Sequence, residues 1–153
     1  MSNDKLVIHN KYVLNELAFM TAGRFYGDSA QKMLDRLMYL GLDENSLGFW
    51  VYDLQENIEL YSPMFRAVLQ YDGKTDFPDS PESWQKAIDK DDLPRVLALF
   101  GEHLESNGEM PYIQKVRYHK KYKGYLDVIC HGKIVSWKDG EPKLMVGVHL
   151  EPL

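Results

Sequence analysis

The amino-acid sequence predicts an α+β fold: a five-stranded antiparallel sheet with helices on one side, preceded by an N-terminal helical segment. Three observations lead to this prediction. Apolar residues recur at helical spacing up to residue 42, the period becomes that of strands from Gly48, and the order from there is two strands, three helices and three strands. A chain of 153 residues has the length of one domain. We divide it into the helical segment at 1–42 and a main domain at 48–151.

Two helices are predicted in the N-terminal segment. We expect Gly23 and Gly27 to separate them, Asp28 or Ser29 to cap the second, and Gly41 to end it. The first carries its apolar residues at Tyr12, Val13, Leu14, Leu17, Ala18 and Met20. The second carries them at Met33, Leu34, Leu37, Met38 and Tyr39. Because such stripes cannot remain in water, the segment is predicted to cover the main domain or to pack on a second copy of itself.

Five strands are predicted in the main domain from runs of aromatic and β-branched residues. They lie at 49–52, 58–61, 111–121, 125–137 and 143–151. Turn residues separate the paired strands, at 55–57, at Lys123-Gly124 and at Asp139-Gly140. The last of these pairs is a strong hairpin signal, and the strands are therefore predicted to pair antiparallel.

Three helices are predicted between the second and third strands. Ser62-Pro63 begins one that runs to Tyr71, residues 72–81 form a loop, and residues 83–88 form a short helix. The longest follows Asp89, which is expected to accept a hydrogen bond from the amide three residues on, and it ends at Asn107-Gly108. Its predicted apolar face is Leu93, Val96, Leu97, Phe100 and Leu104.

Charge and cysteine content exclude several classes of protein. A net charge of −5 and a pI near 5.5 argue against a nucleic-acid-binding surface, which needs a basic stripe. The one basic cluster, at 115–123, is interpreted as the solvated face and turn of a hairpin. The single cysteine, Cys130, excludes an internal disulfide and suits a reducing cytosol. No apolar run approaches the ~20 residues that span a bilayer, so we expect a cytoplasmic protein that does not enter a membrane.

Five segments of the main domain, in order, carry a resemblance to a known family. They are G-F-W-V-Y-D-L at 48–54, Y-S-P-M-F-R-A-V-L-Q-Y at 61–71, F-P-D-S-P-E-S-W at 77–84, D-G-E-P at 139–142 and V-G-V at 146–148. Together they resemble the PAS family, especially the branch common in bacterial sensor histidine kinases and diguanylate cyclases. Two segments depart from its pattern. The family's H-P-E-D-R is here Asp89 to Leu93, without the His and Pro, and its closing D-I-T is Glu151-Pro152-Leu153.

The resemblance implies a small pocket between helices and sheet. Residues 147–151, G-V-H-L-E, are similar to the G-V-Q-L-D of the flavin-binding LOV branch, in which the Gln faces the flavin. Strand alternation then directs His149 into the pocket. The predicted ligand-binding residues are His149, Met145, Cys130, Val128, Tyr118, Val116, Phe100, Leu97 and Leu69. The opposite face carries Tyr125, Ile129, Val148 and Leu150, which the N-terminal helices are expected to cover.

No cofactor is expected, although non-covalent flavin or haem binding stays open. His149 has three functional interpretations, namely ligand contact, haem ligation or pH sensing. The structural alternative is a core histidine that is hydrogen-bonded to a backbone carbonyl or a tyrosine. His103 lies beside the apolar stripe of the longest helix and is expected in solvent or at the stripe edge. The LOV motif N-C-R-F-L-Q is absent and Cys130 lies on a strand, which argues against a flavin–cysteine adduct. The histidines show no metal-binding spacing.

No catalytic residue is predicted, because the chain has no Gly-x-Ser-x-Gly or phosphate loop and helix capping explains Asp91 and Asp92. We therefore expect a sensory module. A ligand in the pocket, or a partner on the sheet, would alter the packing of the N-terminal helices, and a homodimer would relay this to an effector such as a histidine kinase or diguanylate cyclase, in cis or in trans. The alternative is a small enzyme or carrier with the cone-shaped fold of ketosteroid isomerases. A carboxyl of raised pKa deep in the pocket would favour that alternative, whereas a mostly apolar pocket and the order of elements favour PAS.

Overall fold

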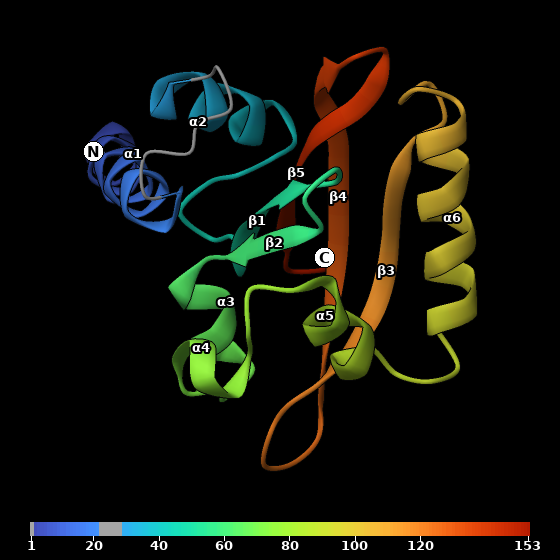
Figure 1. Ribbon diagram of the computed structural model, residues 1–153. Helices are drawn as coiled ribbons and strands as arrows, with labels where there is room; N and C mark the ends of the chain where they lie inside the picture. Colours follow the sequence, from blue (N-terminus) through green and yellow to red (C-terminus); the bar gives the residue numbers. More distant parts are fainter. Residues whose placement is uncertain (1, 22–28) are drawn as a thin grey trace.

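The computed structural model describes residues 2–21 and 29–153 (Figure 1). Its helices are α1 (Ser2–Thr21), α2 (Ala30–Tyr39), α3 (Pro63–Val68), α4 (Gly73–Asp76), α5 (Pro81–Ala87) and α6 (Leu93–Glu105). Its strands are β1 (Gly48–Asp53), β2 (Ile58–Tyr61), β3 (Tyr112–His119), β4 (Tyr125–Lys138) and β5 (Glu141–Leu150). The strands form one sheet in the order β2-β1-β5-β4-β3, and every neighbouring pair is antiparallel. The predicted fold class is confirmed.

The N-terminal helices cover the outer face of the sheet, on the side away from α6 (Figure 1). Ser29 caps α2, because its hydroxyl accepts a hydrogen bond from the amide of Lys32 at 3.2 Å. Gly41 follows the C-cap residue Leu40 with a positive φ of 115°, as expected for a glycine that ends a helix. The predicted boundary residues Gly23, Gly27 and Asp28 lie outside the described residues. The core between helices and sheet contains Val13, Leu17, Met20, Met33, Leu34 and Leu37 from the helices and Phe49, Val51, Leu60, Leu144, Val146 and Val148 from the strands.

Four residues of the predicted helical stripes are exposed and do not cover the main domain, whereas packing on a second copy stays a prediction. They are Tyr12 and Ala18 on α1, and Met38 and Tyr39 on α2. In each helix the sheet covers only a narrow sector, and residues adjacent in sequence lie 100° apart around the axis. The buried sector of α1 contains Val13, Leu17 and Met20 at spacings of four and three, whereas Tyr12 and Ala18, which adjoin Val13 and Leu17, are exposed.

Helices α3 to α6 cover the inner face. The hydroxyl of Ser62 accepts hydrogen bonds from the amides of Phe65 and Phe49, so one side chain both caps α3 and anchors it to β1. Pro63 occupies the first turn, as predicted. The expected loop at 72–81 contains the short helix α4, and α5 begins at Pro81, two residues earlier than expected.

Helix α6 begins later than predicted. Asp89 accepts a hydrogen bond from the amide of Asp91, two residues on, and not from the amide three residues on. Asp92 holds the N-cap position without a side-chain cap. Both carboxylates instead bind Arg117 of β3, at 3.2 and 3.0 Å. This ion pairing, together with that of Lys121 and Asp76, supports the interpretation of the basic cluster as one face and turn of a hairpin.

The buried sector of α6 is rotated relative to the prediction. Leu97 is 41% exposed, whereas His103, expected in solvent or at the stripe edge, is buried. Its Nδ1 donates to the carbonyl of Met110 and its Nε2 accepts from the amide of Ile134. The bond to Ile134 joins the end of α6 to β4, and the bond to Met110 joins it to the segment before β3. With His103 toward the core, Leu97 lies on the outward side of the helix.

The outer face is only partly covered. Val148 is fully buried and Leu150 partly, as expected, and Val146 of the same face is fully buried as well. Tyr125, however, is 53% exposed and Ile129 is half-buried. The helices lie over β1, β2 and β5, and β4 extends past them toward the hairpin turn (Figure 1).

Candidate functional site

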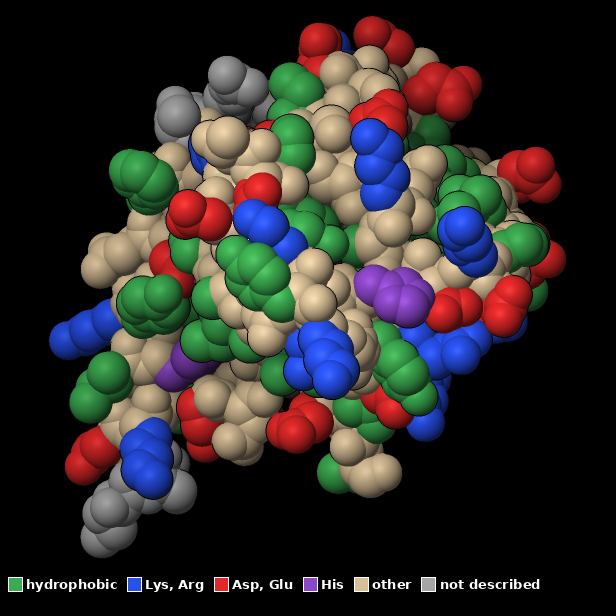
Figure 2. All heavy atoms as spheres, turned by 90° about the horizontal axis from the view of Figure 1, so that it is seen from below, with side chains coloured by type: hydrophobic (Ala, Val, Ile, Leu, Met, Phe, Trp, Pro, Cys, Tyr) green, Lys and Arg blue, Asp and Glu red, His purple; other side chains and the backbone are tan. Residues whose placement is uncertain are grey.

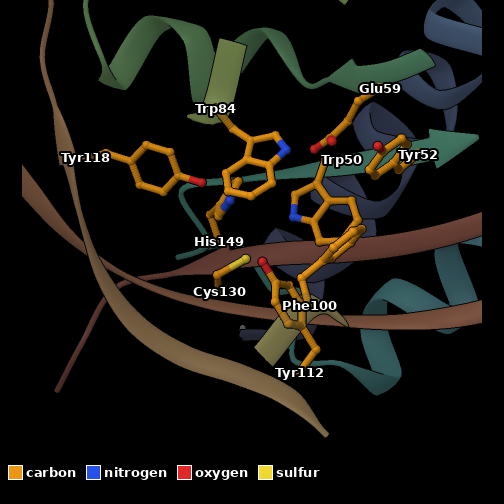
Figure 3. A pocket seen from close by; sticks show the side chains of 9 residues that line it. All are labelled: Trp50, Tyr52, Glu59, Trp84, Phe100, Tyr112, Tyr118, Cys130 and His149. Carbon is orange, nitrogen blue, oxygen red and sulfur yellow. The ribbon is translucent and has the colours of Figure 1, made fainter. Parts of the chain in front are cut away.

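A small cavity lies between the inner face of the sheet and helices α5 and α6 (Figure 3). Its volume is about 10 Å³, roughly the room for one water molecule. All five strands contribute to its wall, as do α5 and α6. The lining residues are Trp50, Tyr52, Glu59, Trp84, Phe100, Tyr112, Tyr118, Cys130 and His149. Aromatic rings therefore form most of the wall.

The structure places the predicted ligand-binding residues in three groups. Phe100, Tyr118, Cys130 and His149 line the cavity. A second group lies in the surrounding core without lining it: Leu69, Val116, Val128 and Met145. Leu97 faces solvent on α6, so its assignment to the pocket was wrong.

Sequence reasoning missed five residues that line the cavity, namely Trp50, Tyr52, Glu59, Trp84 and Tyr112. A signal for three of them was present, because Trp50 and Tyr52 alternate along β1 with residues of the outer face, and Glu59 is paired with Tyr52 across β1 and β2.

Trp50 lies in a shallow trough on the sheet. Gly132 and Gly147 are paired across β4 and β5, and Trp50 is paired with Gly147 across β1 and β5. A Cβ on Gly147 would lie 2.0 Å from Cζ2 of the indole, and a Cβ on Gly132 would lie 2.7 Å from its Cη2. Only glycine at these two positions leaves room for the indole, which fills the space above the centre of the sheet.

His149 is a buried, neutral histidine, with 1% of its surface exposed. Its ring stacks on Phe65 and meets Tyr118 edge-on. Burial lowers the pKa of its imidazole to about 3. Nδ1 has no hydrogen-bond partner among the described residues, which differs from the expected bond to a carbonyl or a tyrosine.

Glu59 introduces a carboxyl group into the aromatic wall. The side chain is 4% exposed, and burial raises its pKa well above the usual range, although Trp84 and Tyr61 lower it in part. Its Oε1 has no hydrogen-bond partner within the described part of the chain. The pocket is therefore not purely apolar, and it contains the raised carboxyl that was expected for the cone-fold alternative. The strand order, with two strands before the middle helices and three after, is the one expected for PAS.

The cavity as it stands does not fit a flavin or a haem. Ligand pockets typically measure roughly 300–1,000 Å³, whereas this one measures about 10 Å³. Cys130 lies on β4, and burial raises the pKa of its thiol to about 12, so it is not a nucleophilic thiolate. Both ring nitrogens of His103 are hydrogen-bonded within the protein, which leaves neither free to bind iron.

Among residues 2–21 and 29–153, no group of three or more His, Cys, Asp or Glu side chains is arranged to hold a metal ion. Across the same described residues, no helix combines the length and the apolar character needed to cross a bilayer.

Known proteins with solved structures share this arrangement. A sensory box histidine kinase/response regulator from Burkholderia thailandensis E264 is 26% identical, with a TM-score of 0.55 over 67% of this chain and 74% of that one. The N-terminal domain of a diguanylate cyclase with PAS/PAC sensor from Marinobacter aquaeolei is 16% identical, with a TM-score of 0.59 over 68% and 93%. The LOV protein of Rhodobacter sphaeroides is 16% identical, with a TM-score of 0.54 over 79% and 67%.

Sequence comparison with whole families gives the assignment. No curated protein matches the chain. The family model described as the PAS fold matches residues 58–149, which is more than half of the chain and includes every element from β2 to β5. The strand order, the helical layer on the inner face and this match agree, and the chain belongs to the PAS family.

Proposed function

We propose that this chain is a signal-sensing module in which the cavity on the inner face of the sheet controls the packing of the N-terminal helices on the outer face. The observation that carries the proposal is the position of β1. Trp50 and Tyr52 of this strand line the cavity. The alternate residues, Phe49 and Val51, point to the other face and pack in the core formed with α1 and α2. A ligand that displaces Trp50 therefore acts on a strand whose next residue contacts the helices.

The same geometry supports coupling through β5. His149 lines the cavity, and its neighbour Val148 is buried among residues of the N-terminal helices. The two layers are thus joined by two adjacent strands, since β1 and β5 pair directly. A change of ligand shifts the population between two packings of the helices, provided that the ligand binds one of them more tightly.

We propose that the homodimer forms through the exposed side of α1. Ile8, Tyr12 and Phe19 lie along one stripe of this helix and are exposed, on a different sector from the buried Val13 and Leu17. Figure 2, in which α1 keeps its place at the left edge, shows hydrophobic side chains along this helix among charged ones. A helical stripe of this kind suits a second copy of the same helix. In sedimentation experiments, Phe19→Glu should shift the dimer to monomer, whereas a monomeric wild type would contradict the proposal.

The effector is proposed to be a histidine kinase or a diguanylate cyclase, in cis or in trans. This rests on the two similar structures, which come from proteins of those two classes. The module itself is proposed to be non-catalytic, and the small cavity favours function without a bound flavin or haem. Cys130, a buried free thiol, favours the cytoplasm as its location.

The proposal is tested by making the pocket responsive to a known molecule. Trp84→Ala removes an indole from the wall, and added indole is expected to refill the hole. Hydrogen–deuterium exchange is then measured over α1 and α2, with and without indole. Indole should change the exchange of both helices in the variant and leave the wild type unchanged.

A second variant guards against loss of folding. Trp84→Leu leaves a smaller hole and should give the same response with a smaller amplitude. If refilling alters exchange only in α5, α6 and the inner strands, the cavity does not control the N-terminal helices and the proposed function is wrong.

A further inference from the structure

The cavity surrounds one carboxyl group with six aromatic rings. Glu59 is paired with Tyr52 across the ladder of β1 and β2, and its carboxyl points toward the indoles of Trp84 and Trp50 (Figure 3). None of the described residues that line the cavity is a lysine or an arginine. Aromatic faces attract cations electrostatically, and groups of such faces bind ammonium ligands in other proteins. The wall therefore has the composition of an aromatic site for a cation, in which the carboxyl group has no positively charged partner among the described lining residues.

The carboxyl of Glu59 is only partly satisfied by the protein. It is buried, and its Oε1 has no hydrogen-bond partner among the described residues. A buried polar group in this state costs free energy, and an apolar residue would fill the same position without that cost. Hydrogen bonds with Trp84 and Tyr61 offset part of this cost, and a ligand that pairs with the carboxylate would recover more of it.

The other titratable groups near Glu59 are uncharged and cannot supply the missing positive charge. Burial lowers the pKa of His149 to about 3 and raises the pKa of the Cys130 thiol to about 12. Burial also raises the pKa of the tyrosines that face Glu59 from β1, β2 and β3, which are Tyr52, Tyr61, Tyr112 and Tyr118. Helix α5 carries two charged residues, Glu82 and Lys86, and both are exposed and do not line the cavity.

We propose that this pocket binds a small organic cation with an ammonium group, which pairs with the carboxylate of Glu59 inside the ring of aromatic side chains. The inference rests on the proposed function, because it names the class of ligand that the sensing cavity takes. The volume of about 10 Å³ admits one group the size of a water molecule, which matches an ammonium head. Phe100 is half-buried and stacks on Tyr52, so a ligand with methyl groups would have to displace this pair of rings.

Binding is coupled to the loss of a proton. Burial raises the pKa of Glu59 well above its usual range, so the empty pocket favours the protonated carboxylic acid over the carboxylate. The ammonium ion arrives from water already charged, the carboxylic acid releases its proton to solvent, and a carboxylate–ammonium pair remains. One cation enters for up to one proton released, so the charge inside the pocket stays balanced.

The experiment is calorimetric titration with methylammonium chloride at neutral pH, in phosphate and in PIPES, two buffers that carry no primary ammonium group. The difference in heat between the buffers gives the number of protons released, and the fluorescence of Trp50 and Trp84 provides a second readout. Wild type should bind saturably with proton release. Glu59→Gln should weaken binding at least about tenfold, or about 1.4 kcal/mol. Glu82→Gln, which changes an exposed carboxylate beside the pocket, should bind as wild type does.

Methanol, which has the same number of heavy atoms but no charge, is the matched ligand control. The inference is overturned if methanol binds as well as methylammonium, if Glu59→Gln leaves the affinity unchanged, or if wild type shows no saturable binding. The indole experiment separates the two proposals. A response of α1 and α2 to indole without methylammonium binding leaves the sensing function standing and removes only the ligand class.

Discussion

The imidazole of His149 lies on the ring of Phe65, with the ring centroids 3.9 Å apart and the planes inclined by 22°. This stack joins the last strand of the sheet to α3, whose N-terminus Ser62 ties to β1. The histidine is therefore enclosed on one side by α3 and on the other by the cavity. It is held as a neutral ring, because no charged group contacts it and burial disfavours protonation.

His149 should make the protein less stable in acid. The pKa of the imidazole is lowered to about 3 in the folded state from 6.5, so the unfolded chain takes up a proton first as the pH falls. Stability is therefore present above pH 6.5 and is lost below it, by about 2 kcal/mol between neutral pH and pH 5. Urea denaturation of wild type and His149→Phe at both pH values measures this.

His149→Phe should lack this pH-dependent loss of about 2 kcal/mol in unfolding free energy. His103 is present in both proteins, so its contribution to the pH dependence is the same in each. Equal pH dependence in the two proteins would show that His149 titrates normally. The same variant tests ligand contact, since a pocket ligand that touches His149 should no longer bind.

Glu59 should have the opposite effect on stability, which it should lower as the pH rises. Its pKa is raised by burial, so above about pH 4.5 the unfolded chain releases the proton while the folded protein retains it. Stability then falls by about 1.4 kcal/mol for each pH unit until the folded pKa is reached. Glu59→Gln should remove this loss, and its stability relative to wild type should rise from pH 4.5 to pH 7. A difference that does not change with pH would contradict a raised pKa.

Gly147→Ala should force Trp50 out of its trough. The added Cβ would lie 2.0 Å from the indole, and relief of this overlap should cost about 3 kcal/mol of unfolding free energy. Gly101→Ala on α6 is the control, since a Cβ there meets no atom within 4 Å and should stabilise the helix by roughly 0.5–1 kcal/mol. Trp50→Leu combined with Gly147→Ala should recover part of the loss. Thermal unfolding with unchanged Tm for Gly147→Ala would show that the indole is elsewhere.

The ion pair of Asp53 and Lys143 should be strongly coupled. Their oxygen and nitrogen atoms lie 2.8 Å apart, and both side chains are largely buried where β1 meets β5. Lys143→Met leaves a buried carboxylate and should cost about 3 kcal/mol, whereas the double variant with Asp53→Asn should cost less. A double-mutant cycle in urea measures the coupling, and additive single effects would contradict it.

The order of elements and the inward face of β4 and β5 could be predicted from sequence, because side chains alternate strictly along a strand. Val128, Cys130 and Met145 point inward as the alternation requires. The ligand-binding role assigned to those residues stays a prediction.

The faces of the helices were predicted less well, because tertiary bonds rotate them. His103 is buried by its bonds to Met110 and Ile134, neither of which adjoins it in sequence, and Leu97 is exposed as a result. Arg66 is buried for a similar reason, since its guanidinium donates to the carbonyls of Tyr61 and Phe77 and pairs with Asp79. The volume of the cavity also escapes prediction, because it depends on how closely large rings pack.

Along β1, neighbouring residues serve separate layers, with Trp50 and Tyr52 at the cavity and Phe49 and Val51 beneath the N-terminal helices. Substitutions at one set can alter ligand chemistry while the helix interface keeps its own residues. Insertion or deletion of a single residue cannot be tolerated in the same way, because it would send every side chain of the strand to the other face. Natural or engineered variation in ligand preference should therefore accumulate as point changes at alternate positions, with the length of this strand held fixed.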